Sequence, residues 1–174
     1  DLLDYMDGSA AVIGEMMLPI LEPLRPEALP HARDLGNAFQ LTNFLRDIDE
    51  DLDRGRQYVP QEDLRRFGVD LTQRVVTPEF IELMRFEIAR CRELYASAEQ
   101  GRSMLPPASA RCIGAAHDLY SRILVRIEEQ TRPATYSTVV MGAAKTLRKF
   151  RDQTSSKKAI ATPCRTRVRR ASPW

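Results

Sequence analysis

The chain has 174 residues, 43% of them hydrophobic, and its 26 Lys and Arg nearly balance its 24 Asp and Glu. This length predicts one domain with a buried core. No apolar run reaches about 18 residues, which predicts no transmembrane segment. The start, Asp-Leu-Leu, carries no signal-peptide pattern. Three scattered cysteines without His partners at metal spacing are typical of free thiols, so we expect a cytoplasmic protein.

Residues 1–22 are predicted to form a helix. Its spacing places Tyr5, Ser9, Ile13 and Met16/Met17 on one side, and Gly8, Ala11, Val12 and Glu15 on the adjoining side. Small residues at helical spacing usually indicate close packing between helices. They could also form a pocket wall with room for a long hydrocarbon. Four prolines end the segment, and the next helix is predicted to begin near His31.

Residues 35–60 contain a central helix with two unlike faces. The apolar face holds Ala38, Leu41, Leu45, Ile48 and Leu52. The polar face holds Gly36, Gln40, Asn43, Asp47, Glu50 and Asp51. Gly55 and Pro60 are predicted to end this helix and leave a loop over residues 54–59.

The spacing of Asn43, Asp47 and Asp51 is i, i+4, i+8, which stacks three side-chain oxygens along one side of a helix. Such oxygens suit Mg²⁺. The alternative is an ordinary solvated acidic face. Like charges at i, i+4 destabilise a helix unless a positive charge lies between them. Guanidinium groups flank the row at Arg46, Arg54 and Arg56, and their geometry suits phosphate oxygens. Together they favour a metal–diphosphate site.

The rest of the chain is also predicted to be helical. Helices are expected at Gln61–Phe67, 79–104 and 108–129, and the last two have apolar residues at helical spacing. Tyr120 falls on the apolar face of the last of these, as a core tyrosine would. Residues 137–150 could form a further helix. Residues 151–174 carry a net charge of +6 and no apolar periodicity, which predicts a disordered basic tail. No strand-like alternation occurs, so the fold class is all-α.

Two segments resemble the squalene/phytoene synthase family. QLTNFLRDIDEDLDRGRQYVP is similar to the family's second aspartate-rich motif, NxxxDxxxD, and DLLDYMDGSAAVIGEMMLPIL to its YxxGSAxxxG helix. The residues of both motifs are most similar to those of bacterial phytoene synthases, and the resemblance covers about residues 1–130. It implies an isoprenoid (terpenoid) synthase-type helical bundle. The implied activity is a transferase that joins two geranylgeranyl diphosphates head to head into phytoene, in carotenoid biosynthesis.

The resemblance also implies roles for individual residues. Catalytic roles fall on Tyr5, Arg46 and Tyr120, and substrate contacts on Gln40, Arg46, Arg56, Tyr58, Ser9 and Ile13. The metal ligands are Asn43, Asp47 and Asp51, and the cofactor is Mg²⁺, with Mn²⁺ as a substitute. A squalene or dehydrosqualene synthase would share these motifs, and the squalene type would also need NADPH.

The family's first aspartate-rich motif, which lies upstream of the YxxGSA helix, has no counterpart here. We therefore expect residues 1–150 to be the C-terminal part of one isoprenoid synthase domain that is incomplete at its N-terminus. Alone, this part would be inactive, or it would be a non-catalytic remnant that binds prenyl diphosphates. Its partner is a prenyl diphosphate, and the lipid product would favour peripheral contact with a membrane. The basic tail lacks the aromatic interleaving of a nucleic-acid-binding segment.

Overall fold

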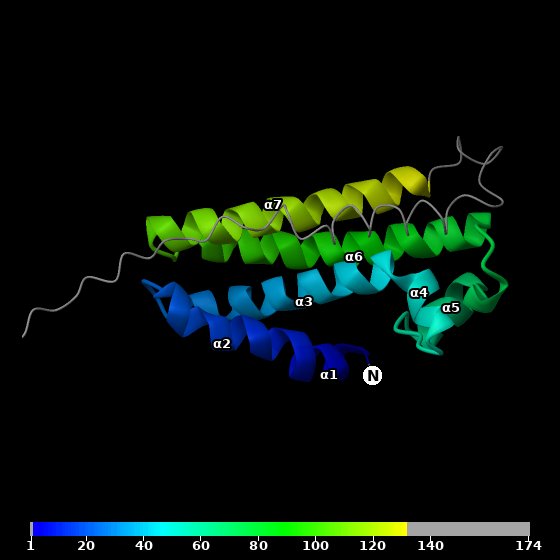
Figure 1. Cartoon of the computed structure of the whole chain (residues 1–174), viewed down its shortest axis with the longest axis horizontal. Helices are drawn as coiled ribbons and strands as arrows, with labels where there is room; N and C mark the ends of the chain where they lie inside the picture. Colours follow the sequence, from blue (N-terminus) through cyan, green and yellow to red (C-terminus); the bar gives the residue numbers. More distant parts are fainter. Residues whose placement is uncertain (1, 132–174) are drawn as a thin grey trace, which may run out of the picture.

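The computed structural model describes residues 2–131, and every regular element in that range is helical (Figure 1). The elements are α1 (Leu2–Met6), the π-helix η1 (Asp7–Ala11), α2 (Val12–Leu21), α3 (Ala28–Arg46), α4 (Ile48–Asp53), α5 (Gln61–Phe67), the 3₁₀ helix η2 (Leu71–Gln73), α6 (Pro78–Arg102) and α7 (Pro107–Gln130). The all-α prediction is confirmed. None of the described helices is long and apolar enough to cross a membrane.

Helix ends follow local chemistry. The Thr77 hydroxyl accepts a hydrogen bond from the Phe80 amide at 3.2 Å and caps α6, whose first residue is Pro78. Gly68 ends α5 in the left-handed conformation, with φ 67°. The predicted helices at Gln61–Phe67 and 79–104 therefore match α5 and α6 at these two ends within one residue.

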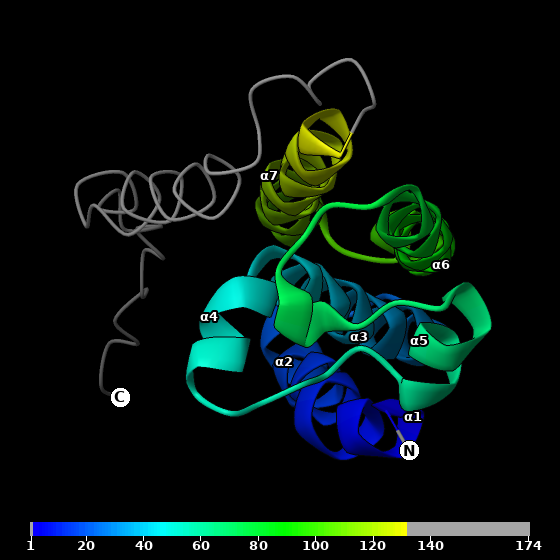
Figure 2. The same ribbon diagram turned by 90° about the vertical axis from the view of Figure 1, so that its right-hand side faces the viewer.

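Helix α3 is the central element of the bundle. It lies between α1–α2 on one side and the antiparallel pair α6–α7 on the other, and both views agree on this arrangement (Figures 1 and 2). The main core joins these helices through Met6, Ala38, Leu41, Phe44, Leu45, Met84, Ile88, Cys91, Tyr95, Ile123, Leu124 and Ile127. A second cluster under α5 contains Val59, Leu64, Leu71 and Leu83.

Two glycines set the close approach of α2 and η1 to α3. A Cβ atom on Gly14 would lie 2.0 Å from the Ala32 carbonyl oxygen, and one on Gly36 would lie 2.2 Å from that of Ala10. At Gly14 the small residue therefore serves close helix packing. A Cβ on Gly8, in contrast, would meet nothing within 4 Å.

Three predicted helix boundaries were wrong. Residues 1–22 are not one α-helix, because a π-turn interrupts them at η1. Helix α3 begins at Ala28 rather than at His31, since Pro30 falls in the first turn, where no amide donor is needed. The central helix is divided at Asp47, whose φ of −103° and ψ of 13° are not helical. The predicted helix at 137–150 and the tail at 151–174 lie outside the described residues.

The apolar face predicted on the central helix is likewise shared between two cores. Ala38, Leu41 and Leu45 are buried in the main core. Ile48 and Leu52, which follow the break, are only partly buried; Ile48 packs against both cores and Leu52 against the second cluster. The apolar residues of α4 therefore extend from the main core to the second cluster.

Candidate functional site

The row of Asn43, Asp47 and Asp51 keeps its spacing across the break between α3 and α4. The Asp47 amide donates to the Asn43 carbonyl at 2.9 Å, and the Asp51 amide donates to the Asp47 carbonyl at 2.8 Å. These two bonds have the i to i−4 pattern of an α-helix. The three side chains therefore still occupy successive turns.

The side-chain oxygen of Asn43 is unusual for a well-packed helix. Its Oδ1 is buried and has no hydrogen-bond partner within the described part of the chain. A buried polar atom without a partner costs about 1–3 kcal/mol, so an unsatisfied carbonyl oxygen at this position fits a ligand that supplies positive charge. The donor set of one amide oxygen and two carboxylates suits Mg²⁺ or Mn²⁺.

Asp51 is the buried carboxylate of the row, with 9% of its surface exposed. Burial raises its pKa above the usual range, and the charge of Asp47 adds to the effect, while Arg54 and Arg56 oppose it. A bound cation would offset both causes, because its positive charge stabilises the ionised carboxylate. The electrostatics at Asp51 therefore also fit a positively charged ligand.

Asp47 is bound by its neighbour. Arg46 donates from Nε to one carboxylate oxygen at 2.8 Å and from Nη2 to the other at 2.6 Å. This pair raises the pKa of Arg46. The sequence predicted that Arg46 contacts phosphate. In this structure its positive charge instead offsets the negative charge of Asp47. Among the described residues, no three His, Cys, Asp or Glu side chains form a metal cluster, so a cation here would depend on Asn43.

Two tyrosines from distant segments meet beside the row. Tyr58 stacks on Phe44 of α3, with ring centroids 4.0 Å apart, and the Tyr5 ring lies 5.8 Å from that of Tyr58. The charge and hydroxyl group of Tyr58 raise the pKa of Tyr5. The same loop is tied to α4, because the Arg56 amide donates to the Asp51 carbonyl at 2.8 Å. Arg56 itself is exposed.

Tyr120 of α7 lies on the Arg46 side of α3. Its ring is 4.2 Å from that of Phe39, and its hydroxyl contributes to the raised pKa of Arg46. Gln40 is half-buried on α3, three residues before Asn43. The structure thus places both residues near the row, although neither contacts it through a hydrogen bond between side chains in the described part of the chain.

The remaining predicted residues lie on the outer face of α1, η1 and α2. Tyr5 is 49% exposed and Ile13 is 52% exposed. The Ser9 hydroxyl donates to the Tyr5 carbonyl at 2.6 Å. Met16, Met17 and Ile20 continue this face and are also exposed. Tyr5, Ile13, Met16, Met17 and Ile20 thus form an exposed apolar strip that Ser9 interrupts, and Tyr5 at its start lies beside Tyr58.

Comparisons with known proteins agree with this architecture. A squalene/phytoene synthase family profile matches residues 1–151. The chain belongs to the squalene/phytoene synthase family. The phytoene synthase of Arthrospira platensis is 38% identical over 68% of this chain and 44% of its own length. The 15-cis-phytoene synthase of Paracoccus sp. is 36% identical over 74% of this chain and 42% of its own length.

Solved structures of squalene/phytoene synthase relatives share the fold. Squalene synthase HpnC of Alicyclobacillus acidocaldarius has a TM-score of 0.71 and 32% identity, over 75% of this chain and 51% of that one. A dehydrosqualene synthase solved with a ligand has a TM-score of 0.68 and 25% identity, over 89% and 57%. The chain thus spans less than half the length of these two phytoene synthases and just over half of these two structures.

Two structural features of this squalene/phytoene synthase family member were not predicted from the sequence. Phe44, which joins Tyr5 to Tyr58, has no signal beyond its place on the helix. Thr42 is fully buried; its hydroxyl donates to the Ala38 carbonyl at 2.7 Å and lies 2.8 Å from the Tyr95 hydroxyl. A threonine inside the predicted core helix was the available signal for this network.

Proposed function

We propose that this chain carries the second metal–diphosphate-binding motif of a prenyltransferase that joins two geranylgeranyl diphosphates head to head into phytoene. One observation carries the proposal. The buried Oδ1 of Asn43 has no partner among the described residues, and it lies one turn before Asp47 and two turns before Asp51. Similar proteins also support the proposal, because they include phytoene synthases from several organisms.

In this mechanism Asn43, Asp47 and Asp51 would hold Mg²⁺. The bound ion supplies Lewis acidity toward diphosphate oxygens and stabilises diphosphate as a leaving group. Arg46 would then leave Asp47, or share it, and take part of the diphosphate charge. Arg56, which is exposed on the loop after α4, would approach from the other side.

The hydrocarbon part of the substrate would lie along the apolar strip of Tyr5, Ile13, Met16, Met17 and Ile20. This strip begins next to the tyrosine pair and has no carboxylate among its members. Apolar walls exclude water from the carbocation that forms when diphosphate leaves. Tyr5 and Tyr120 would lie nearest the reacting carbon and the diphosphate, respectively.

A squalene or dehydrosqualene synthase is the second candidate. The observation that favours it is the fold match to a squalene synthase and a dehydrosqualene synthase. The two candidates differ in substrate length and, for squalene, in the need for NADPH. Assays with C15 and C20 diphosphates, with and without NADPH, would separate them once the chain is joined to an upstream half. Squalene formed from the C15 substrate would overturn the phytoene proposal.

The metal motif is tested on the chain itself by calorimetric titration with inorganic diphosphate in the presence and absence of Mg²⁺. Asp51→Asn should weaken Mg²⁺-dependent binding at least tenfold. Glu93→Gln, which removes an exposed carboxylate on α6, is the matched control and should bind as the parent chain does. Equal binding by Asp51→Asn and the parent chain would contradict the ligand assignment, and binding without Mg²⁺ would contradict the metal.

A non-catalytic remnant that binds prenyl diphosphates would show the same Mg²⁺-dependent binding. It is distinguished by turnover, because a remnant stays inactive when an upstream half with its own aspartate-rich motif is supplied. Peripheral contact with a membrane, which would let the lipid product leave, is also part of this proposal. Flotation of the chain with neutral phospholipid vesicles tests it independently of catalysis.

A further inference from the structure

Helix α4 and the residue before it hold two rows of carboxylates. Asp47 and Asp51 belong to the row that begins at Asn43, and Asp49 and Asp53 form a second row with the same i, i+4 spacing. Each member of the second row follows its counterpart by two residues, which is about 200° of turn along a helix, so the two rows lie on different sides of α4. Like charges at i, i+4 destabilise a helix. The second row therefore needs a positive partner of its own.

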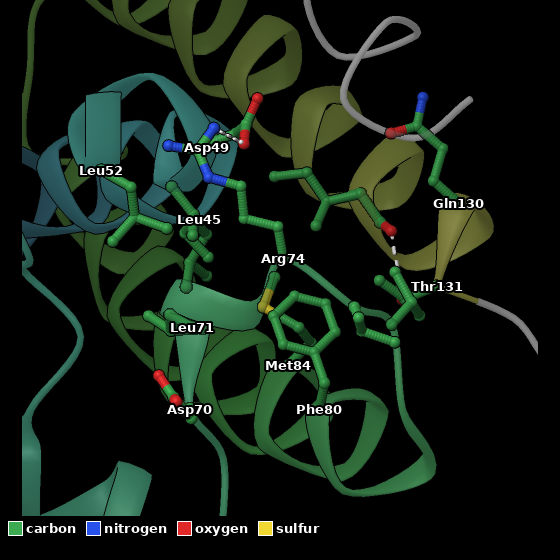
Figure 3. A pocket seen from close by; sticks show the side chains of 14 residues that line it. Leu45, Asp49, Leu52, Asp70, Leu71, Arg74, Phe80, Met84, Gln130 and Thr131 are labelled. Atoms are coloured by element: carbon green, nitrogen blue, oxygen red, sulfur yellow. Dashed lines mark hydrogen bonds and ion pairs between the residues drawn. The ribbon is translucent and has the colours of Figure 1, made fainter. Parts of the chain in front are cut away.

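The positive partner of the second row comes from the end of η2. Arg74 donates from Nη1 to Asp49 at 2.8 Å and from Nη2 to Asp53 at 2.6 Å. Figure 3 shows the Arg74 side chain reaching toward α4 and its contact with Asp49. The two carboxylates lie 25 and 21 residues from Arg74 in the chain. The pair of Arg46 and Asp47, in contrast, joins neighbouring residues. Arg74 therefore ties α4 to a separate element, which the Arg46 pair does not.

The backbone of Arg74 is itself held in place. Its amide donates to the Leu71 carbonyl at 3.1 Å, and Leu71 is buried in the second cluster. Asp70 caps η2 by accepting a hydrogen bond from the Thr72 amide at 2.9 Å. Arg74 has a φ of 52°, a left-handed conformation that is unfavourable for a residue with a side chain. An anchored backbone therefore presents the Arg74 guanidinium to α4.

Helix α4 depends on such contacts because it is short and acidic. It has six residues, whereas an isolated helix shorter than about 12–15 residues is marginal in water. Its apolar residues, Ile48 and Leu52, are only partly buried. Both line a cavity of about 200 Å³ in the described part of the chain (Figure 3). Because apolar packing on this side of α4 is incomplete, the ion pairs with Arg74 carry more of the restraint.

We propose that Arg74 is a positioning residue for the metal–diphosphate motif, because its two ion pairs hold α4, and with it the Asp51 carboxylate, in place relative to Asn43 of α3. This inference rests on the function proposed above for Asn43 and Asp51. Arg74 acts through Asp49 and Asp53, on a different side of α4 from the metal row. Without Arg74 these two carboxylates repel each other and α4 loses its tie to η2, so Asp51 is held less firmly beside the rest of the row.

Hydrogen exchange of the whole chain, without metal or diphosphate, tests whether Arg74 holds α4. In Arg74→Gln the amides of Asp51 and Arg54, which are hydrogen-bonded at α4, should exchange about fivefold faster, as expected for the loss of two partly exposed ion pairs. Amides in the middle of α6 should not change. The matched control is Arg85→Gln, which removes the same charge and one ion pair, with Glu82 of its own helix, and should exchange as the parent chain does. Unchanged exchange at α4 in Arg74→Gln, or equal acceleration in α6 or in the control, would overturn the proposal.

Binding separates positioning from general stability. Arg74→Gly removes both ion pairs, but glycine adopts a φ of 52° without strain, so its thermal midpoint should stay close to that of the parent chain. In calorimetric titrations with inorganic diphosphate and Mg²⁺, Arg74→Gly and Arg74→Gln should bind about threefold more weakly, because a helix that is in place for less of the time lowers the apparent affinity. Arg85→Gln should bind as the parent chain does.

The titrations distinguish failure of this inference from failure of the proposed function. Parent-like binding by both Arg74→Gly and Arg74→Gln would overturn the positioning role. If the parent chain itself binds no diphosphate with Mg²⁺, the proposed function fails, and the exchange measurement still decides whether Arg74 holds α4. Arg74→Lys keeps a positive charge between Asp49 and Asp53, so it should recover part of both the slow exchange and the affinity.

Discussion

The ring of Tyr58 stacks on the ring of Phe44, with centroids 4.0 Å apart and planes inclined by 11°. This contact fixes the loop after α4 to the C-terminal end of α3, one residue after Asn43. A second contact, from the Arg56 amide to the Asp51 carbonyl, fixes the same loop to α4. The two contacts place Arg56, a candidate diphosphate ligand, at a defined position relative to the acidic row.

We predict that Tyr58→Ala lowers the free energy of unfolding and that Tyr58→Phe does not. An aromatic pair contributes about 0.5–1.5 kcal/mol beyond the area it buries, and alanine loses both terms. Urea denaturation followed by circular dichroism measures the difference. Since Tyr58→Phe keeps the ring and removes only the hydroxyl, it also tests whether that hydroxyl raises the pKa of Tyr5. Equal stability of the alanine variant and the parent chain would show that the stack does not hold the loop.

The two aspartates of the row should respond differently to neutralisation. Asp51→Asn removes a buried carboxylate that Asp47 repels, so stability should hold or rise by a few tenths of a kcal/mol. Asp47→Asn breaks a bidentate pair and leaves the Arg46 guanidinium, which is 22% exposed, without its carboxylate. That should cost about 1.5 kcal/mol. Thermal melts of the two variants side by side give the comparison, and a loss of the same size in both would contradict this electrostatic account.

Stability should depend on the pH through Glu87. This side chain is 1% exposed, and burial raises its pKa to about 7 from an ordinary 4.5, with Asp63 adding to the effect and Arg90 opposing it. The folded state therefore binds this proton more tightly than the unfolded state. The stability that protonated Glu87 adds to the folded state is fully present below about pH 4.5 and is lost as the pH rises to about 7. The loss is of order 3 kcal/mol, at about 1.36 kcal/mol per pKa unit.

The Glu87 prediction has a direct control. Glu87→Gln should be more stable than the parent chain at pH 8, and its unfolding free energy should change less between pH 4.5 and 7. Glu93→Gln, on an exposed position of the same helix, should keep the pH dependence of the parent chain. Chemical denaturation at each pH measures both. If Glu87→Gln kept the full pH dependence, another group would be responsible.

The close packing of α2, η1 and α3 predicts opposite effects for two glycine substitutions. Gly36→Ala places a methyl group within 2.2 Å of the Ala10 carbonyl and should destabilise the chain by about 1–3 kcal/mol. Gly8→Ala meets nothing within 4 Å and should stabilise the helix by about 0.5–1 kcal/mol. Both variants add one methyl group, so the difference between their thermal melts measures the effect of the contact between Gly36 and Ala10. Similar shifts in both variants would contradict it.

Local sequence patterns were sufficient for the elements that depend on local chemistry. The 3.6-residue spacing of apolar residues predicted α6 and α7 within a few residues. A short helix was predicted at α5 as well, since Thr77, Gly68 and the proline pair at 106–107 act on their own helix ends. Those same patterns could not show the break at Asp47. Apolar spacing shows which residues can share a helix face, whereas the break is a change of φ and ψ at one residue within a continuing i to i−4 hydrogen-bond pattern.

In the candidate site, the oxygen donors and their i, i+4, i+8 spacing follow from the sequence positions of Asn43, Asp47 and Asp51. The burial and partners of these side chains depend on the tertiary structure. Arg46 closes on Asp47, packing leaves the Asn43 oxygen without a partner, and burial raises the pKa of Asp51. It also decided that Tyr5 and Tyr58 meet across Phe44, 53 residues apart in the chain. Spacing along a helix fixes direction, whereas burial and partners depend on which other helices pack against it.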